Sequence, residues 1–417
     1  MKRLARFRRI RRGWWAFLGL TSLFVLSLFL ELLVNRRPLF ISYDGRWACP
    51  AAADWVNGLP LLGGVPDFQK RSDFGQAGGS EVDYRRFART AADPGLLGAE
   101  IAAKEGELAE LSRGLAAAPP PGQSADRIEL QDYADLRGSL DEVRTELKEL
   151  RLSRTAFQDG RARILLPLYP YSPDEHLLSL PGRPPHPPSR EHPLGTDDAG
   201  KDVLAQLVYG FRVAMAFGLT VVAFSFLLGI LAGAVMGYFG GWTDILLQRV
   251  VEIGASVPFL FTIMVIASVA QPGFFQLCLL LIVLHGWLGI THYVRGEFYR
   301  EKAKDYVQAA VAIGASDLSI MLRHILPNAL VPVVTLAPFA VGGTIGLLVS
   351  LDYLGLGLPV GTPSWGALLD QGVRHVRSHP RLILIPSAAL ALTLLAVALI
   401  GEAVREAFDP KPFSRLR

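Results

Sequence analysis

Ionisable side chains inside apolar runs are the first candidates for chemistry in this chain. Glu252 and His285 each lie in a stretch long enough to cross a lipid bilayer, and Pro258 follows Glu252 closely. An ionisable group within a membrane span is energetically unfavourable, so by default it marks a transport pathway. We therefore name Glu252, Pro258 and His285 as candidate pathway residues. A satisfied buried group or an interfacial position is an equally good interpretation of Glu252 and of His285.

A near match to a phosphate-binding loop occupies residues 195–202, which read G-x-x-x-x-G-K-D. That loop needs a Ser or Thr hydroxyl for Mg²⁺ at its last position, whereas Asp202 would place a carboxylate beside the phosphates. We predict instead that Thr196 caps a helix whose first turn carries Asp197 and Asp198. The sequence contains no zinc-protease, catalytic-triad, redox or nucleotide motif, so we expect no enzyme activity and no metal or cofactor bound by this chain.

Composition indicates a mixed architecture. The 417 residues are 51% hydrophobic and 19% charged, which is too apolar for a soluble domain and too charged for membrane throughout. The net charge of +4 has no basic stripe, so nucleic acid is not an expected partner. Cys49 and Cys278 are the two cysteines, and we expect both to be unpaired because Cys278 lies in an apolar run.

Six apolar runs predict an all-α integral membrane protein with six transmembrane helices, since about 20 residues cross a bilayer. The Arg-rich segment 1–12 precedes the first span at 13–34 and keeps this end in the cytoplasm. A cleaved signal peptide is the alternative, but the run is long and no small-residue cleavage site follows it promptly. Six crossings place both termini on the cytoplasmic side. The other five spans are expected at 211–238, 245–269, 274–294, 329–351 and 382–400.

Residues 35–195 contain no spanning run and are predicted to form one extracytoplasmic insert. Apolar residues recur at heptad spacing on both sides of a Pro-rich break, which predicts an antiparallel helical hairpin at about 94–152 with arms of about 20 to 28 residues. Lys104 occupies one position of this seam, and Asp93–Pro94 marks its start. Residues 163–193 are rich in proline and aromatics, so we predict neither strand nor helix there.

A row of small residues runs along the second span. Ser225, Gly229, Gly233 and Gly237 recur every four residues and therefore share one helix face. Such a face lets another helix approach closely in lipid. We interpret it as a packing surface.

The polar interruption at 298–328 separates two apolar runs. It is predicted to form two short helices, Tyr299–Ile313 and a second one capped by Ser316 with Asp317 in its first turn. Gly314 supplies the left-handed backbone between them, and Pro327 is expected to stop the second helix. Ala309 and Ala310 keep one face thin, so a partner protein can approach it closely. An ordinary amphipathic loop is the alternative.

This interruption resembles the coupling loop of ABC-importer permeases. The matching residues are Q-A-A at 308–310, Gly314 and I-M-L-R-H-I-L-P-N at 320–328, with Gln308 standing where the family usually has Glu. The strings HPLGTD-x-x-G-x-D and DYLGLGLPVGTPSWG resemble other segments of dipeptide and oligopeptide permeases of the C type. The resemblance implies that the loop docks into a cytoplasmic ABC ATPase. The residues carried over to that role are Tyr306, Gln308, Ala309, Ala310, Gly314, Ser316, Asp317, His324 and Pro327.

The same resemblance implies a type I ABC importer permease of the bacterial inner membrane, with a permease core at 196–413. The implied partners are a second permease subunit, an ATPase that holds ATP and Mg²⁺, and a periplasmic solute-binding protein. The pattern is most similar to the Yej-type subgroup, which is linked to oligopeptides and microcin C. A permease for a dipeptide or nickel, a secondary transporter, and an envelope scaffold built on the hairpin are the alternatives. A secondary transporter would need polar sites in two matching halves, which the sequence does not show.

Overall fold

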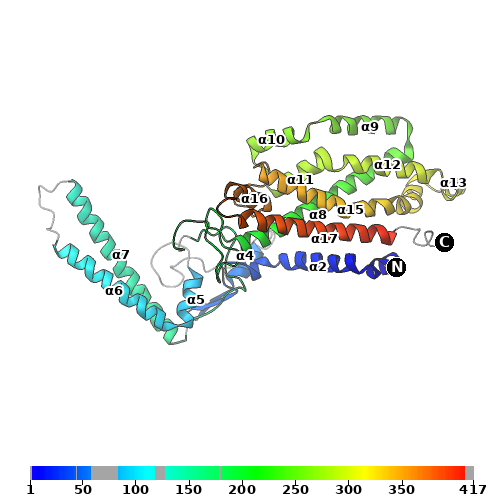
Figure 1. The fold of residues 1–417 in the computed structure, drawn as a ribbon. Helices are drawn as coiled ribbons and strands as arrows, with labels where there is room; N and C mark the ends of the chain where they lie inside the picture. Colours follow the sequence, from blue (N-terminus) through cyan, green and yellow to red (C-terminus); the bar gives the residue numbers. More distant parts are fainter. Residues whose placement is uncertain are drawn as a thin grey trace. The chain divides into compact units, whose positions relative to one another are not determined.

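The computed structural model describes residues 2–43, 45–57, 83–117, 127–160, 162–177 and 180–408 (Figure 1). The chain divides into two compact units. The first is Met1–Leu28 with Pro173–Arg417, and the second is Phe29–Ser172. The proline-rich break expected at 119–122 lies outside the described residues.

The first unit is a helical bundle whose longest members run side by side (Figure 1). Two π-helical segments, η2 and η3, interrupt it. Its helices are α1 (Lys2–Arg9), α2 (Arg11–Ser27), α8 (Val203–Phe239), α9 (Gly241–Ser256), α10 (Phe259–Ala270), α11 (Phe274–Leu281), η2 (Ile282–Gly286), α12 (Leu288–Lys302), α13 (Asp305–Ala312), α14 (Asp317–Ser319), η3 (Ile320–Ile325), α15 (Leu326–Tyr353), α16 (Trp365–Arg374) and α17 (Arg381–Phe408).

Three helical stretches in the described residues are long and apolar enough to cross a membrane: Val203–Phe239, Asp317–Tyr353 and Arg381–Phe408. Two bent pairs raise the number to as many as five, α9 with α10 at 66° and the stretch Phe274–Gly286 with α12 at 46°. The bend between α9 and α10 lies at Pro258, which directly precedes α10. The first predicted span differs from the structure: α2 ends at Ser27 after 17 residues, and 13–34 is not one continuous helix. A sixth crossing stays a prediction.

The packing role assigned to the row of small residues in α8 is confirmed. All four residues of the row are buried, and three of them lie directly against α12. A Cβ added at Gly229 would lie 1.8 Å from Ile290 Cγ2, and one at Gly233 would lie 2.5 Å from the carbonyl oxygen of Thr291. One at Gly237 would lie 2.5 Å from Phe298 Cβ. No side chain fits between the two helices, so their backbones meet along about two and a half turns of α8.

The second unit joins a small sheet to helices. Strand order is β2-β1-β3, and both pairs are antiparallel. The prediction that 163–193 contains no strand is wrong at its start, because Arg163, Ile164 and Leu165 pair with β1. These three residues precede the first proline of the segment, Pro167, so their backbone N–H groups remain available for the sheet. The elements are β1 (Phe40–Tyr43), β2 (Arg46–Ala48), β3 (Ala162–Leu165), α3 (Leu30–Leu33), α4 (Pro50–Asn57), α5 (Tyr84–Ala92), α6 (Pro94–Ala117) and α7 (Arg127–Gln158).

The helices α6 and α7 lie side by side (Figure 1). They have 24 and 32 residues, so α7 exceeds the expected length. Asp93 Oδ1 accepts a hydrogen bond from the Gly95 N–H at 2.8 Å, as its place before Pro94 predicts. Lys104 lies 2.8 Å from Glu146 of α7 and 2.9 Å from Glu107. These carboxylates raise the pKa of Lys104 to about 12, and they explain how a cation is tolerated in the seam.

The contact between α8 and α12 predicts a position-specific effect of adding one methyl group. Gly233→Ala should destabilise the bundle by about 1–3 kcal/mol, because the new Cβ meets backbone atoms of α12 that cannot move independently. Thermal unfolding of the purified chain in detergent measures this effect. Gly289→Ala on α12 is the matched control, since a Cβ there has no neighbour within 4 Å. Equal melting temperatures for the two variants would contradict the close contact.

Candidate functional site

The polar interruption folds differently from the two helices predicted for it. Helix α12 extends to Lys302, and after a turn α13 begins at Asp305, so Tyr299–Ile313 is not one helix. The break follows from Glu301, whose side chain accepts hydrogen bonds from residues three and five positions further along the chain. Gly314 has φ +79°, which confirms the left-handed backbone predicted there. Ser316 directly precedes α14, as expected, but its hydroxyl makes no capping hydrogen bond.

Pro327 does not stop the second helix, contrary to the prediction. The helix that starts at Asp317 continues through η3 into α15 and ends at Tyr353. The π-helical segment Ile320–Ile325 shifts the hydrogen-bond ladder by one residue. Pro327 then lies in the first turn of α15, directly after the π-helical segment. The second part of the polar interruption, from Asp317 onward, and α15 are therefore one continuous element.

Glu301 holds this region together, and the sequence analysis did not single it out. Its carboxylate is almost fully buried and lies 2.6 Å from Lys304 Nζ. The Tyr306 hydroxyl donates to the other carboxylate oxygen at 2.7 Å and accepts from Asn328 Nδ2 at 3.1 Å. Burial and the bond to Glu301 raise the pKa of Tyr306. One carboxylate thus links the end of α12 to α13 and to the first turn of α15.

Other contacts join the loop to the end of α8. The Tyr238 hydroxyl donates to Asp317 Oδ1 at 2.6 Å, and Lys302 Nζ donates to the Tyr238 carbonyl at 2.5 Å. Gln308 Nε2 donates to the Lys302 carbonyl at 3.0 Å. The backbone carbonyl of His324 accepts from Asn328 Nδ2 at 3.2 Å. The loop is therefore a braced projection and not a loose connection.

The two alanines of this loop have opposite environments. Ala309 is exposed, but Ala310 is only 4% exposed and packs with Val307 in the apolar core that includes Phe298 and Ile325. The expectation that both alanines present a thin face to a partner is therefore wrong for Ala310, which faces the bundle because α13 turns its 307/310 stripe inward.

Apolar side chains are exposed at the tip of the loop, on both sides of Gly314. The exposed fractions are 85% for Ile313, 66% for Leu318, 53% for Val311 and 51% for Leu322. We call these four residues the apolar tip. Val311 and Ile313 lie outside the membrane-length stretches, whereas Leu318 and Leu322 lie at the start of Asp317–Tyr353. An apolar surface of this kind, on a braced support, is typical of a protein–protein contact.

The three candidate pathway residues lie in the two bent pairs. Glu252 accepts a hydrogen bond from Gln248 Nε2 at 3.0 Å and lies 2.5 Å from Arg249 NH1, so its partners are on its own helix. His285 belongs to η2, is exposed, and has its ring 5.2 Å from that of Phe259. Among the described residues no hydrogen bond or ion pair joins Glu252 to His285.

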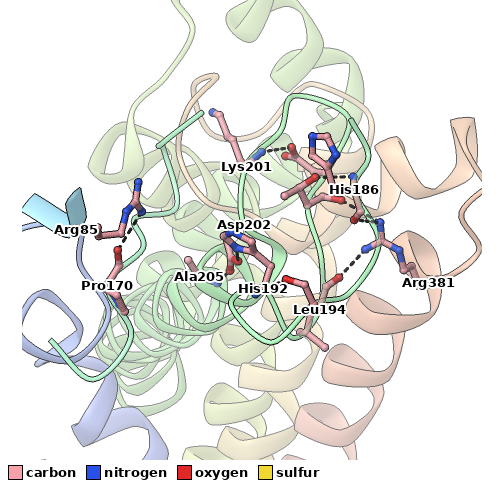
Figure 2. Close-up of polar contacts among 12 residues, drawn as sticks. Arg85, Pro170, His186, His192, Leu194, Lys201, Asp202, Ala205 and Arg381 are labelled. Carbon is pink, nitrogen blue, oxygen red and sulfur yellow. Dashed lines mark hydrogen bonds and ion pairs between the residues drawn. The ribbon is translucent and has the colours of Figure 1, made fainter. Parts of the chain in front are cut away.

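The opposite end of α8 carries a second polar cluster (Figure 2). Asp202 precedes α8 and caps it, with Oδ1 accepting from the Ala205 N–H at 2.8 Å and Oδ2 lying 2.7 Å from His192 Nδ1. Thr196 is not the cap, contrary to the prediction, because its Oγ1 accepts from the His186 N–H at 2.8 Å. The segment from 196 to 202 is a turn in which the helix has not yet begun.

Asp197 shapes that turn. Its Oδ1 accepts from the backbone N–H groups of Ala199 and Lys201, and its Oδ2 accepts from Gln206 Nε2 at 2.8 Å. Burial raises the pKa of the Asp197 carboxyl.

Arg381 joins this turn to α17 (Figure 2). Its guanidinium donates to the carbonyls of Leu194 at 2.6 Å and His186 at 2.5 Å. The polar groups of this cluster bond to one another, so the cluster holds α8 and α17 to the segment 186–202.

A bundle of membrane-length helices, with a braced, apolar-tipped projection between two of them, indicates a membrane protein. Residues 229–414 match the family described as binding-protein-dependent transport system inner membrane component. Over 408 residues the chain is 36% identical to the inner membrane ABC transporter permease protein YejE of Escherichia coli K12, covering 98% of this chain and 96% of that protein. The chain belongs to this family of ABC transporter permeases.

Two further relatives were found. The peptidoglycan transport system permease protein YejE of Agrobacterium fabrum is 34% identical over 410 residues, which cover 98% of this chain and 92% of that protein. The oligopeptide transport system permease protein OppC of Haemophilus influenzae is 37% identical over 220 residues, which cover 53% of this chain and 70% of that protein. The second match covers about half of this chain.

The buried Glu301 carboxylate predicts how the loop responds to loss of one charge. Glu301→Gln keeps the side-chain shape but removes the charge that attracts Lys304, so α13 should open locally more often. Amide hydrogen exchange over 303–313 should accelerate about tenfold, which corresponds to about 1.4 kcal/mol. Asp305→Asn, at an exposed position beside it, is the control and should leave exchange unchanged. Identical exchange in both variants would show that Glu301 does not brace the loop.

Proposed function

We propose that this chain forms half of the pore of a heteromeric ABC importer for peptide-type substrates, which include oligopeptides and microcin C-like compounds. It lies in the bacterial inner membrane with both termini in the cytoplasm. A second permease subunit completes the pore, and a periplasmic solute-binding protein delivers the substrate. Cytoplasmic ABC ATPases bind ATP and Mg²⁺ and grip the loop at 298–328. The observation that carries this proposal is the apolar tip on its braced support.

The tip has the properties that a docking surface for a soluble ATPase requires. Ile313 and Leu318 are the most exposed of its four side chains, and burying such residues against a partner is favourable. The network around Glu301 and the contacts with Tyr238 keep the tip in one geometry relative to α8, α12 and α15. A docked ATPase would therefore move three helices when it moves the tip.

The substrate class rests on the relatives. The protein from Haemophilus influenzae is named for oligopeptide transport and the one from Agrobacterium fabrum for peptidoglycan transport. Peptide bonds are common to both substrate classes. We assign Glu252, Pro258 and His285 to the pathway, because they lie in the two bent spans and because Glu252 and His285 are not closed off by buried partners.

Ile313→Glu provides the test of this proposal. A charge at the centre of the tip should weaken ATPase binding by about 2 kcal/mol, or ~30-fold, and should abolish uptake of labelled trialanine by the assembled importer. Co-purification of the ATPase from membranes, together with uptake, measures both effects. Leu96→Glu is the matched control, because it adds the same charge at an exposed apolar position of α6, outside the loop.

The test uses the tip and not Ala310. Ala310→Glu would bury a charge in the core of the loop and would unfold it, so lost uptake in that variant would not report on docking. Undiminished ATPase capture by the Ile313→Glu chain would contradict the proposal.

A further inference from the structure

A partly buried ion pair joins α9 to α12 near the loop at 298–328. Arg295 NH2 lies 2.5 Å from Asp244 Oδ2, and the Tyr299 hydroxyl donates to the same oxygen at 2.7 Å. Arg295 NH1 also donates to Gln248 Oε1 at 3.3 Å. Arg295 and Tyr299 are four residues apart, so they share one face of α12. Asp244 and Gln248 share one face of α9 in the same way.

Helix α9 has few other attachments to the bundle. Asp244 and Val251 are its only buried residues, and Leu246 and Ile253 are more than half exposed. In Figure 1 α9 and α10 run along the upper edge of the bundle, beyond α12. The chain connection through Gly240 and the ion pair are what hold the first turns of α9. The ion pair therefore decides whether α9 follows α12.

Helix α12 is bound at the same end to the loop that we propose the ATPase grips. Glu301 binds Lys304 and Tyr306 of that loop, and Phe298 packs against Gly237 of α8. Arg295, Phe298, Tyr299 and Glu301 lie within two turns of one helix. Movement of the loop can therefore reach α9 through these two turns, in addition to the chain connection from α8 through Gly240.

Each residue of the ion pair has one polar atom that makes no hydrogen bond to the described residues. Asp244 Oδ1 and Arg295 Nε are buried and have no hydrogen-bond partner among the described residues. An arginine and a carboxylate bind most strongly through two parallel bonds, and these two atoms are the ones that a second bond of this kind requires. The pair can thus adjust its angle without losing the bond that it already makes.

We propose that Asp244 and Arg295, with Tyr299, are positioning residues that form the joint through which α12 moves α9 and the bent span α9–α10. This inference rests on the proposed function, because the movement starts at the ATPase-bound loop. The bent span is then the part of the pore wall that changes position when ATP is bound. Its two halves meet at 66°, so a displacement of α9 changes the direction of α10 as well.

Spin labels report this movement without any substrate. The full importer carries Cys49→Ser and Cys278→Ala in this chain, so that only introduced cysteines are labelled. One sample has labels at Leu246→Cys and Leu395→Cys, and a second sample has labels at Asp305→Cys and Leu395→Cys. These positions are exposed on α9, α13 and α17. Distances are measured without nucleotide and after trapping with MgATP and vanadate. In the unsubstituted joint we expect both distances to change on trapping.

Asp244→Asn and Arg295→Gln should abolish the change at Leu246 and preserve the change at Asp305. They should also lower uptake of labelled trialanine at least tenfold, while the ATPase remains bound and hydrolyses ATP. The double variant Asp244→Arg with Arg295→Asp should restore the Leu246 distance change, which a purely structural role of either residue would not predict. Arg374→Gln, which removes an exposed ion pair on α16, is the matched control and should behave like the unsubstituted chain.

The outcomes separate the two proposals. If the distance between the labels at 305 and 395 does not respond to nucleotide, the proposed docking at the loop is wrong, and so is the joint that depends on it. If Asp305 responds but Leu246 does not, or if Leu246 responds equally in Asp244→Asn, the joint alone is overturned.

Discussion

Direct contact between the backbones of α8 and α12 is the constraint on which the rest of this bundle depends. Lipid offers no hydrophobic drive for helices to associate, so the helices rely on close packing and on polar contacts. The glycines at 229, 233 and 237 permit this contact, and a side chain at any of them would separate the helices. With α12 fixed against α8, Lys302 reaches the Tyr238 carbonyl, and Phe298 packs into the core under the loop.

Polar contacts then extend from the fixed end of α12 in two directions. Glu301 binds the loop, and Arg295 with Tyr299 binds α9. Both sites are buried or partly buried, where charge-assisted hydrogen bonds are stronger than they are in water. The apolar core holds the shape of the bundle, while these few charged contacts join the loop and α9 to α12. A permease that transmits movement needs both kinds of contact.

The sequence predicted those features that depend on local spacing and on single-residue conformation. The four-residue repeat of small side chains indicated a packing face, and Gly314 indicated a left-handed turn, and the structure confirms both. The cap of α8 was assigned to Thr196 instead of Asp202, because the sequence offers four suitable cap residues between 196 and 202 and does not show at which of them the helix starts. The prediction of an exposed Ala310 was also wrong, because α13 is only eight residues long and its orientation is set by the core beneath it.

The amino-acid sequence by itself determined that this chain is a membrane protein of the ABC importer permease kind, with a long insert and a polar loop between two spans. The length of an apolar run and the spacing of a motif are properties of short segments, so they can be read without knowledge of the fold. The tertiary structure alone decided that Glu301 braces the loop, that Pro327 lies inside a continuous helix, and that Asp244 meets Arg295. Each of these features depends on how helices pack or how a turn closes. The distance between Asp244 and Arg295 along the chain, 51 residues, carries no signal of its own.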